Sequence, residues 1–353
     1  DLKDSRMQNR NLWVDYAKAI GILLVVYGHV VRGLLNGGII TENVDFHWLV
    51  DSIIYTFHMP LFFFLSGLFF WHSLNNRGSA GLFCNKIDTI FYPFVLWSLL
   101  QGSIEVVLAR YTNGGVGMGE VLALLWSPRA QFWFLYALFA AFCLAILLYR
   151  RFSTRAFLPL LVLSALFYLL QQWTPRVAAL VFLAQNFVFF ALGIWFNQIR
   201  GSIEPRASAV ALGSGLAFVV AQYVFHGPLG LTYADRGAAS LVVAFIGILF
   251  TVSLCMVLAR RPMGWMLTLG ALSMPIFLMH ILAGSGARVI LSKFLGINDD
   301  TLHIVIGCLA GVLLPIIAAK ILEALGINWL YEMPKRFSVY RWQQRRVAVQ
   351  PAA

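Results

Sequence analysis

The sequence predicts an all-α polytopic membrane protein with about ten transmembrane helices. Of its 353 residues, 60% are hydrophobic and only 12% are charged, and the mean hydropathy is +0.78. This composition argues against a soluble enzyme, and apolar runs of about 20 residues recur along the whole chain. Trp and Tyr gather near the ends of these runs, as interfacial anchors do. The four cysteines are isolated, which predicts neither a disulfide framework nor a metal site.

The apolar runs are separated by short loops that are rich in Gly, Pro and charge. The expected spans are residues 12–31, 50–73, 89–109, 131–149, 156–172, 177–197, 208–225, 237–259, 265–284 and 301–324. No loop is long enough for a separate soluble domain, so residues 1–330 are expected to form one membrane domain. Residues 331–353 are expected to be a basic cytoplasmic tail, whose interleaved aromatic side chains favour an anionic lipid surface over nucleic acid.

The distribution of Lys and Arg predicts that both termini are cytoplasmic, because cytoplasmic loops carry an excess of these residues. In that orientation, 17 of the 26 basic residues lie inside, seven lie outside, and Lys18 and Lys320 lie within spans. The 17 are Lys3, Arg6, Arg10, Arg77, Lys86, Arg150, Arg151, Arg155, Arg200, Arg206, Arg260, Arg261, Lys335, Arg336, Arg341, Arg345 and Arg346; the seven are Arg32, Arg110, Arg129, Arg176, Arg236, Arg288 and Lys293. The net charge of +11 therefore indicates topology rather than nucleic-acid binding.

The first span carries three ionisable residues that hydrocarbon should reject. Within WVDYAKAIGILLVVYGHVVRGL, Asp15, Lys18 and His29 lie on one face of a helix, because each turn takes 3.6 residues. Lys18 and His29 are separated by about 16 Å along the helix axis. Asp15 and Lys18 lie near the cytoplasmic end, where a functional role is favoured and pairing with each other is the structural alternative. His29 lies near the external end, where a buried imidazole indicates a functional site.

Other spans place polar groups near the same external side. In the second span, His58 comes just before Pro60 in YTFHMPLFFFLSGLFF. Further groups on later spans are Gln101, Glu105, Gln131, Trp133, Gln185, Asn186 and His280. Each of them is ordinary alone, and together they predict a shared cavity on the external side.

These residues resemble the membrane acyltransferase-3 family, and within it the sugar and exopolysaccharide O-acetyltransferases. The resemblance rests on Asp15, Lys18 and His29 at their spacing within VDYAKAIGILLVVYGH, and on the phrase FHMPLFFFLSGLFF. WFL at 133–135, FFALG at 189–193 and PIFLMH, which ends at His280, also look like phrases of the family. Ten spans with both termini inside match the family's core.

One region departs from the family's pattern. Before the third span the family usually has two arginines three residues apart, whereas here FCNKIDTIFYPF places Lys86 first and Thr89 second. The donor site is therefore expected to be rebuilt, with nearby Arg77 as one candidate.

The resemblance implies transfer of an acyl group, most often acetyl, from cytoplasmic acetyl-CoA to a hydroxyl of a cell-envelope or extracellular glycan. It implies a multi-pass protein of the bacterial inner membrane. The expected partners are acetyl-CoA, a glycan or lipid-linked sugar, membrane lipid, and proteins of polysaccharide biosynthesis and export. Neither a metal nor a nucleic acid is expected.

The catalytic expectations centre on His29 as the general base, because imidazole titrates near neutral pH. Trp133, His58 or His280 would supply a donor to the oxyanion. Direct attack on the thioester and an acetyl-histidine intermediate both remain open.

The donor-binding expectations lie at the inner face. Lys18, Lys86 and Arg77 would hold the phosphates of coenzyme A, and Asp15 would hold Lys18. The extended pantetheine arm would then follow the polar face of the first span to His29.

Two other classes of membrane protein are also consistent with the hydropathy pattern. A transporter or flippase would use Asp15, Lys18 and His29 as a proton or ion relay. In a purely structural alternative, the polar groups only hold helices together. The spacing of the three residues, together with the phrase FHMPLFFFLSG, favours the acyltransferase.

Overall fold

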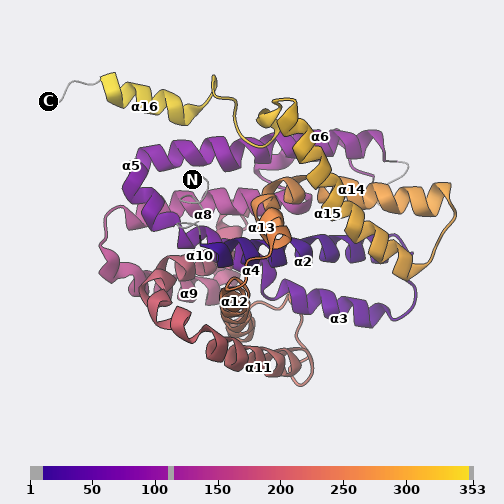
Figure 1. Ribbon diagram of the computed structural model, residues 1–353, viewed down its shortest axis with the longest axis horizontal. Helices are drawn as coiled ribbons and strands as arrows, with labels where there is room; N and C mark the ends of the chain where they lie inside the picture. The colour runs from indigo at the N-terminus through magenta and orange to yellow at the C-terminus, as the bar shows by residue number, and fades with distance from the viewer. Residues whose placement is uncertain (1–10, 110–114, 350–353) are drawn as a thin grey trace.

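The protein is all-helical in the computed structural model, which describes residues 11–109 and 115–349 (Figure 1). The helices are α2 (Leu12–Asn36), α3 (Val44–Tyr55), α4 (His58–Leu68), α5 (Phe70–Lys86), α6 (Tyr92–Val107), α7 (Met118–Leu122), α8 (Trp133–Tyr149), α9 (Phe157–Leu169), α10 (Ala178–Ile203), α11 (Ala207–His226), α12 (Ala238–Leu258), α13 (Gly264–Ala271), α14 (Ser273–Val289), α15 (Asp300–Ala324) and α16 (Val339–Val349). No strand occurs within the described ranges. The predicted all-α class is confirmed.

Eight helical segments within these ranges are long and apolar enough to cross a membrane, as a polytopic membrane protein requires. They are Leu12–Asn36, Val44–Leu68, Phe70–Val107, Met118–Tyr149, Ala178–His226, Ala238–Leu258, Ser273–Phe294 and Asp300–Ala324. Two features account for the difference from the ten expected spans. The expected span 156–172 corresponds to α9, which has only 13 residues. The expected spans 177–197 and 208–225 correspond to α10 and α11, which a single 3-10 turn joins into one helical stretch.

The beginning of α2 and the whole of α16 lie toward the same end of the molecule, at the left of Figure 1. This is the arrangement expected if both ends of the membrane domain meet one side of the bilayer. The cytoplasmic identity of that side stays a prediction. Of the residues that support it, Lys3, Arg6, Arg10 and Arg110 lie outside the described ranges.

Helix α2 runs through the bundle and packs against α4, α12, α13, α14 and α15. Its first turns are fixed by Tyr16, whose hydroxyl donates to the carbonyl of Arg261 at 3.2 Å and accepts from the amide of Met263 at 2.5 Å. Gly270 of α13 lies so close that a Cβ there would meet the carbonyl oxygen of Asp15 at 2.1 Å. The polar residues of α2 are therefore held among other helices at fixed positions.

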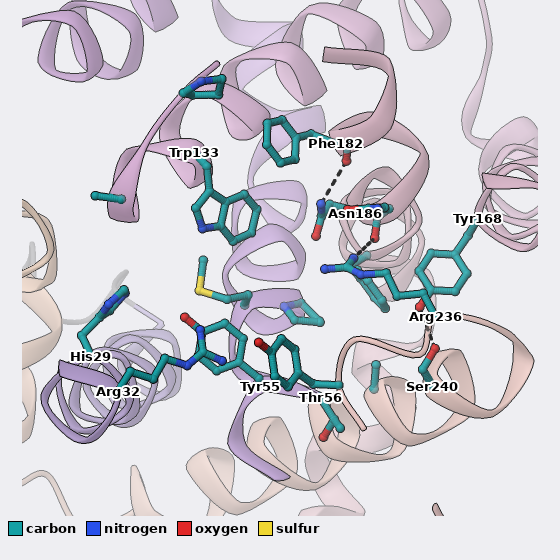
Figure 2. A pocket seen from close by; sticks show the side chains of 18 residues that line it. His29, Arg32, Tyr55, Thr56, Trp133, Tyr168, Phe182, Asn186, Arg236 and Ser240 are labelled. Carbon is teal, nitrogen blue, oxygen red and sulfur yellow. Dashed lines mark hydrogen bonds between the residues drawn. The ribbon is translucent and has the colours of Figure 1, made fainter. Parts of the chain in front are cut away.

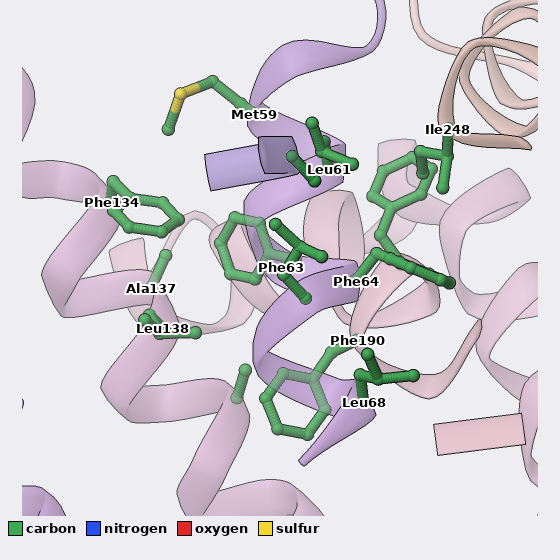
Figure 3. Packing of buried hydrophobic residues seen from close by; sticks show 14 of the residues in the cluster. Met59, Leu61, Phe63, Phe64, Leu68, Phe134, Ala137, Leu138, Phe190 and Ile248 are labelled. Atoms are coloured by element: carbon green, nitrogen blue, oxygen red, sulfur yellow. The ribbon is translucent and has the colours of Figure 1, made fainter. Parts of the chain in front are cut away.

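Helices α4 and α10 cross at a pair of glycines, close to the aromatic packing shown in Figure 3. A Cβ on Gly67 would lie 2.0 Å from the carbonyl oxygen of Phe190, and a Cβ on Gly193 would lie 2.0 Å from that of Phe64. Small residues allow such close approach of membrane helices. The sequence phrases FFFLSG and FFALG are thus two halves of one contact between α4 and α10.

The C-terminal helix α16 is docked on the bundle beside α5 and the π-helical turn Ile87–Phe91. The buried carboxylate of Asp88 accepts from the Ser338 hydroxyl at 2.6 Å and from the amides of Val339 and Tyr340 at 3.0 and 3.2 Å. These bonds satisfy amides at the start of α16 that have no partner within the helix. The expected basic tail therefore contains a helix that packs at a defined position on the membrane domain.

Replacing Asp88 with alanine is expected to release α16. The loss of a capping carboxylate costs about 0.5–2 kcal/mol of local stability, and trypsin should then cleave at Arg341 or Arg345 several times faster. The matched control is Asp299→Ala, because Asp299 caps α15 through the amide of Leu302. Equal cleavage of Asp88→Ala and wild type would show that other contacts hold α16.

Candidate active site

Two cavities meet at His29, the expected catalytic residue on α2. The aromatic cavity has a volume of about 480 Å³, and its walls include Tyr55, Trp133, Phe182 and Tyr233. The apolar cavity has a volume of about 860 Å³, and its walls include Ile104, Leu108, Leu282 and Phe294. His29, Arg32 and Ala130 line both. A half-buried imidazole at this junction can meet two different reactants (Figure 2).

His280 of α14 lies directly beside His29, with the two ring centroids 5.0 Å apart. Its Nδ1 donates to the carbonyls of Phe277 and Ile276 at 2.8 and 3.1 Å, because a carbonyl can only accept. In the neutral ring Nε2 is then an acceptor, and within the described residues this buried atom has no partner. Neutral His280 can therefore orient a neighbouring N–H, whereas donation to an oxyanion requires its cationic form.

His58 of α4 is buried behind the aromatic cavity rather than in its wall. Its Nδ1 donates to the carbonyl of Ile54 at 2.8 Å, and its ring meets the ring of Tyr55 edge-on at 4.5 Å. The structure thus places this candidate where it supports Tyr55, which itself faces the cavity.

Arg32, one turn after His29, forms a buried ion pair that sequence reasoning missed. Its Nε lies 2.9 Å from both carboxylate oxygens of Asp51 on α3, and Nη2 lies 2.8 Å from Oδ2. The guanidinium also lies 3.5 Å from the ring centroid of Tyr55. Gly28 lies against the same pair, since a Cβ there would be in ordinary contact with Asp51 and Tyr55 at 3.5 Å. The sequence did contain one signal, since Arg32 continues the polar face of Lys18 and His29.

The opposite wall of the aromatic cavity is built by α8, α9, α10 and the start of α12 (Figure 2). Trp133 stacks on Phe182, with centroids 5.5 Å apart and planes at 28°. Asn186 donates to the carbonyl of Phe182 at 3.0 Å. Trp133 and Asn186, both expected at an external cavity, do line it, and Arg236 joins them from the loop before α12.

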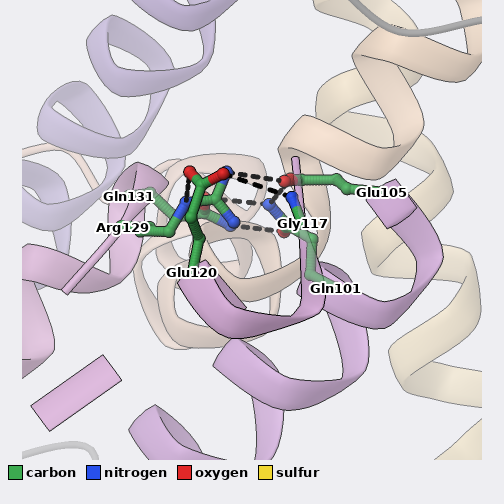
Figure 4. Close-up of polar contacts among 6 residues, drawn as sticks. All are labelled: Gln101, Glu105, Gly117, Glu120, Arg129 and Gln131. Atoms are coloured by element: carbon green, nitrogen blue, oxygen red, sulfur yellow. Dashed lines mark hydrogen bonds and ion pairs between the residues drawn. The ribbon is translucent and has the colours of Figure 1, made fainter. Parts of the chain in front are cut away.

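A polar network behind Trp133 fixes the beginning of α8 (Figure 4). Gln101 and Gln131 exchange amide hydrogen bonds of 3.3 and 2.8 Å, and Gln101 also donates to Glu105 at 2.8 Å. Arg129 pairs with Glu105 at 3.4 Å. Between them, Ala130 has a φ of +46°, a conformation that costs a non-glycine residue about 1–3 kcal/mol. The network therefore holds a strained turn where both cavities meet.

The expected donor-binding residues lie away from His29. Lys18 is about 16 Å from it along α2, and Lys86 lies with Nζ 4.3 Å from the ring centroid of Phe142. Arg77 is exposed on α5, and Asp15 is buried. None of these four residues lines the aromatic or the apolar cavity.

Thr89 takes no part in a basic cluster. Its hydroxyl donates to the carbonyl of Asn85 at 2.8 Å within its own helix. Within the residues that the structure describes, no group of three or more His, Cys, Asp or Glu side chains is placed to hold a metal ion.

Comparison with known proteins gives a family match over most of the chain. A family model described as an acyltransferase domain matches residues 11–320. Nodulation protein NolL of Sinorhizobium fredii is 28% identical over 204 residues, which cover 57% of this chain and 52% of that protein. Nodulation protein NolL of Mesorhizobium japonicum is 26% identical over 195 residues, 55% of this chain and 49% of that protein. The chain thus matches about half the length of these relatives. No solved structure matches it.

Proposed function

The chain belongs to the acyltransferase-3 family of membrane acyltransferases, and on this premise we propose that it transfers acetyl from acetyl-CoA to a hydroxyl of a cell-envelope glycan. We place it in the bacterial inner membrane with both termini cytoplasmic. The observation that carries the proposal is the position of His29 in the walls of two cavities. The family match favours this function over the transporter and the purely structural alternative.

In the proposed reaction, His29 removes the proton from the acceptor hydroxyl as the oxygen attacks the thioester carbonyl. The new C–O bond forms, the C–S bond then breaks, and the proton passes from His29 to the departing thiolate. The acceptor sugar occupies the aromatic cavity, where the faces of Tyr55, Tyr233 and Trp133 offer apolar contact to its C–H groups. His280 would orient His29 once a ring N–H of His29 turns to its unpaired acceptor Nε2, since the two ring centroids lie 5.0 Å apart.

The oxyanion of the tetrahedral intermediate needs a donor or a cation beside the reacting carbon. Trp133 remains the sequence-derived candidate, since its indole N–H is a donor and its ring lines the aromatic cavity. Arg32 is the stronger candidate from the structure, because its cation lines both cavities together with His29. In this proposal, His58 stabilises Tyr55 rather than contacting the oxyanion.

Acetyl-CoA is the proposed donor, with its phosphates at the inner face. Lys18 stands on α2 about 16 Å from His29, a distance that an extended pantetheine arm can cover. Lys86 and Arg77 belong to α5, at the side of the bundle where α16 docks, so the basic residues of α16 are near the same face. This grouping is a proposed substitute for the basic residue that Thr89 replaces.

The direct test uses purified protein in liposomes with acetyl-CoA and a fragment of the host's own envelope glycan. We expect release of free coenzyme A and an ester-bound acetyl group on the glycan, both measured by mass spectrometry. Incubation without acceptor distinguishes the two routes, since an acetyl-histidine intermediate would leave acetyl on the protein. If no glycan is acetylated while labelled glycan crosses the liposome membrane, the protein is a transporter instead.

A further inference from the structure

The aromatic cavity carries a positive charge that no carboxylate balances. Its lining contains two arginines, Arg32 and Arg236, and no acidic residue. Arg32 is already neutralised by Asp51. Among the described residues, Arg236 makes no ion pair.

The nearest candidate to balance Arg236 is its neighbour in sequence, Asp235, which is bound elsewhere. The Asp235 carboxylate accepts from the amide of Thr232 at 2.8 Å and from the Thr232 hydroxyl at 2.9 Å. These two bonds lower the pKa of Asp235 below its usual value and hold the carboxylate in its own turn. Asp235 therefore does not neutralise Arg236, whose charge can interact with a ligand in the aromatic cavity.

Most hydrogen-bond donors of the Arg236 guanidinium are not used by protein acceptors among the described residues. A guanidinium has five N–H donors, and the bond it makes, from Nη1 to the carbonyl of Gln185, is long at 3.4 Å. Figure 2 shows the side chain reaching from the loop before α12 toward Asn186, into the space between the walls. Surrounding protein atoms lower the pKa of Arg236, and Tyr168 and Tyr233 oppose this shift. The guanidinium nevertheless stays charged, as it does in proteins generally.

Arg236 is exposed to solvent, so water solvates its guanidinium and an anion that enters the cavity can take the place of that water. Arginine matches the two oxygens of a carboxylate or phosphate through parallel N–H donors. We infer that the acceptor is an anionic glycan, whose carboxylate or phosphate binds Arg236 while its hydroxyl lies at His29. This inference rests on the proposed function, since it names the class of acceptor for the same cavity.

The test measures binding without acetyl-CoA, so it does not depend on turnover. Protein in nanodiscs of neutral lipid is titrated with a glucuronate-containing disaccharide, with a sugar phosphate, and with a neutral disaccharide. We expect the wild type to bind one or both anionic sugars at least tenfold more tightly than the neutral sugar. The sugar that binds more tightly shows whether the site recognises a carboxylate or a phosphate. The preference should weaken as salt rises.

Arg236→Gln should reduce the preference at least tenfold, because the charge and the paired charge-assisted hydrogen bonds are both lost. Arg236→Lys should keep part of it, since the charge remains and the paired donors are lost. The matched control is Arg176→Gln, because Arg176 is an exposed arginine that lines neither the aromatic nor the apolar cavity.

Equal binding of neutral and anionic sugars would overturn the inference, as would an unchanged preference in Arg236→Gln. Stronger Arg236-dependent binding of an anionic lipid headgroup than of either anionic sugar would also overturn it, since Arg236 would then serve a lipid. A protein that binds the anionic sugar through Arg236 and never consumes acetyl-CoA would refute the transferase and leave this inference standing. A transferase that acetylates neutral and anionic sugars with equal kcat/KM would refute the inference alone.

Discussion

Replacing His29 with alanine is expected to lower acetyl transfer about 10²- to 10⁴-fold, the range that loss of a general base produces. The fold should survive, because the half-buried side chain faces two existing cavities and its removal enlarges them rather than creating a new void. Steady-state kcat and KM for both substrates, with circular dichroism as the check on folding, measure the effect. Because His29 is proposed to act in the chemical step, kcat should fall more than the KM of either substrate changes.

The matched control for this variant is His72→Ala. His72 is an exposed histidine of α5 that contacts Asn76 at 2.8 Å and lines neither the aromatic nor the apolar cavity. It should retain full transfer. If His280→Ala loses more transfer than His29→Ala, the base has been assigned to the wrong imidazole. Full activity of His29→Ala would remove the catalytic role altogether.

Hydropathy predicted the helices well, because a membrane requires long apolar segments wherever the chain crosses it. It predicted their breaks less well. The expected span 156–172 ends early, since α9 stops at Leu169. The expected span 265–284 is divided at Leu272 between α13 and α14. Such breaks depend on packing between helices, which average hydropathy along one chain does not record.

The candidate site was predicted where periodicity on one helix carried the information. His29 was placed by the helical spacing of α2, and His280 and Trp133 were placed by their position near external ends of spans. All three line one or both of the cavities that meet at His29. Their exact roles were not accessible, because the hydrogen bonds of His280 Nδ1 to its own helix decide which ring nitrogen is left to act.

The ion pair of Arg32 with Asp51 could not be predicted in the same way. Its partners belong to different helices, and Asp51 lies near the start of an expected span, where an acidic residue is unremarkable. Arg236 lies in a loop and was counted only for topology. Contacts between elements that no spacing rule connects become visible only when the helices are packed together.

Replacing Asp51 with alanine is expected to have the largest effect on stability. Removing one partner of a buried ion pair costs about 3–5 kcal/mol, because the other charge is left uncompensated. Asp51 is fully buried while 20% of the Arg32 side chain is exposed, so the lower end of that range is expected. Thermal unfolding in detergent micelles measures the loss.

The matched control is Glu204→Ala, which removes the exposed pair of Arg200 and Glu204 four residues apart. Exposed pairs of this kind contribute less than about 1 kcal/mol. A loss from Asp51→Ala no larger than that from Glu204→Ala would show that water already compensates Arg32.

The double variant Arg32→Met with Asp51→Leu separates stability from chemistry. Replacing both charges by apolar side chains of similar volume is often neutral or stabilising, so the unfolding temperature should return close to that of the wild type. Transfer should not return, because Arg32 lines both cavities beside His29 and is proposed to stabilise the oxyanion. A double variant with both stability and full transfer would show that the pair only holds α2 against α3. A stable double variant without transfer would assign the cation of Arg32 to the reaction itself.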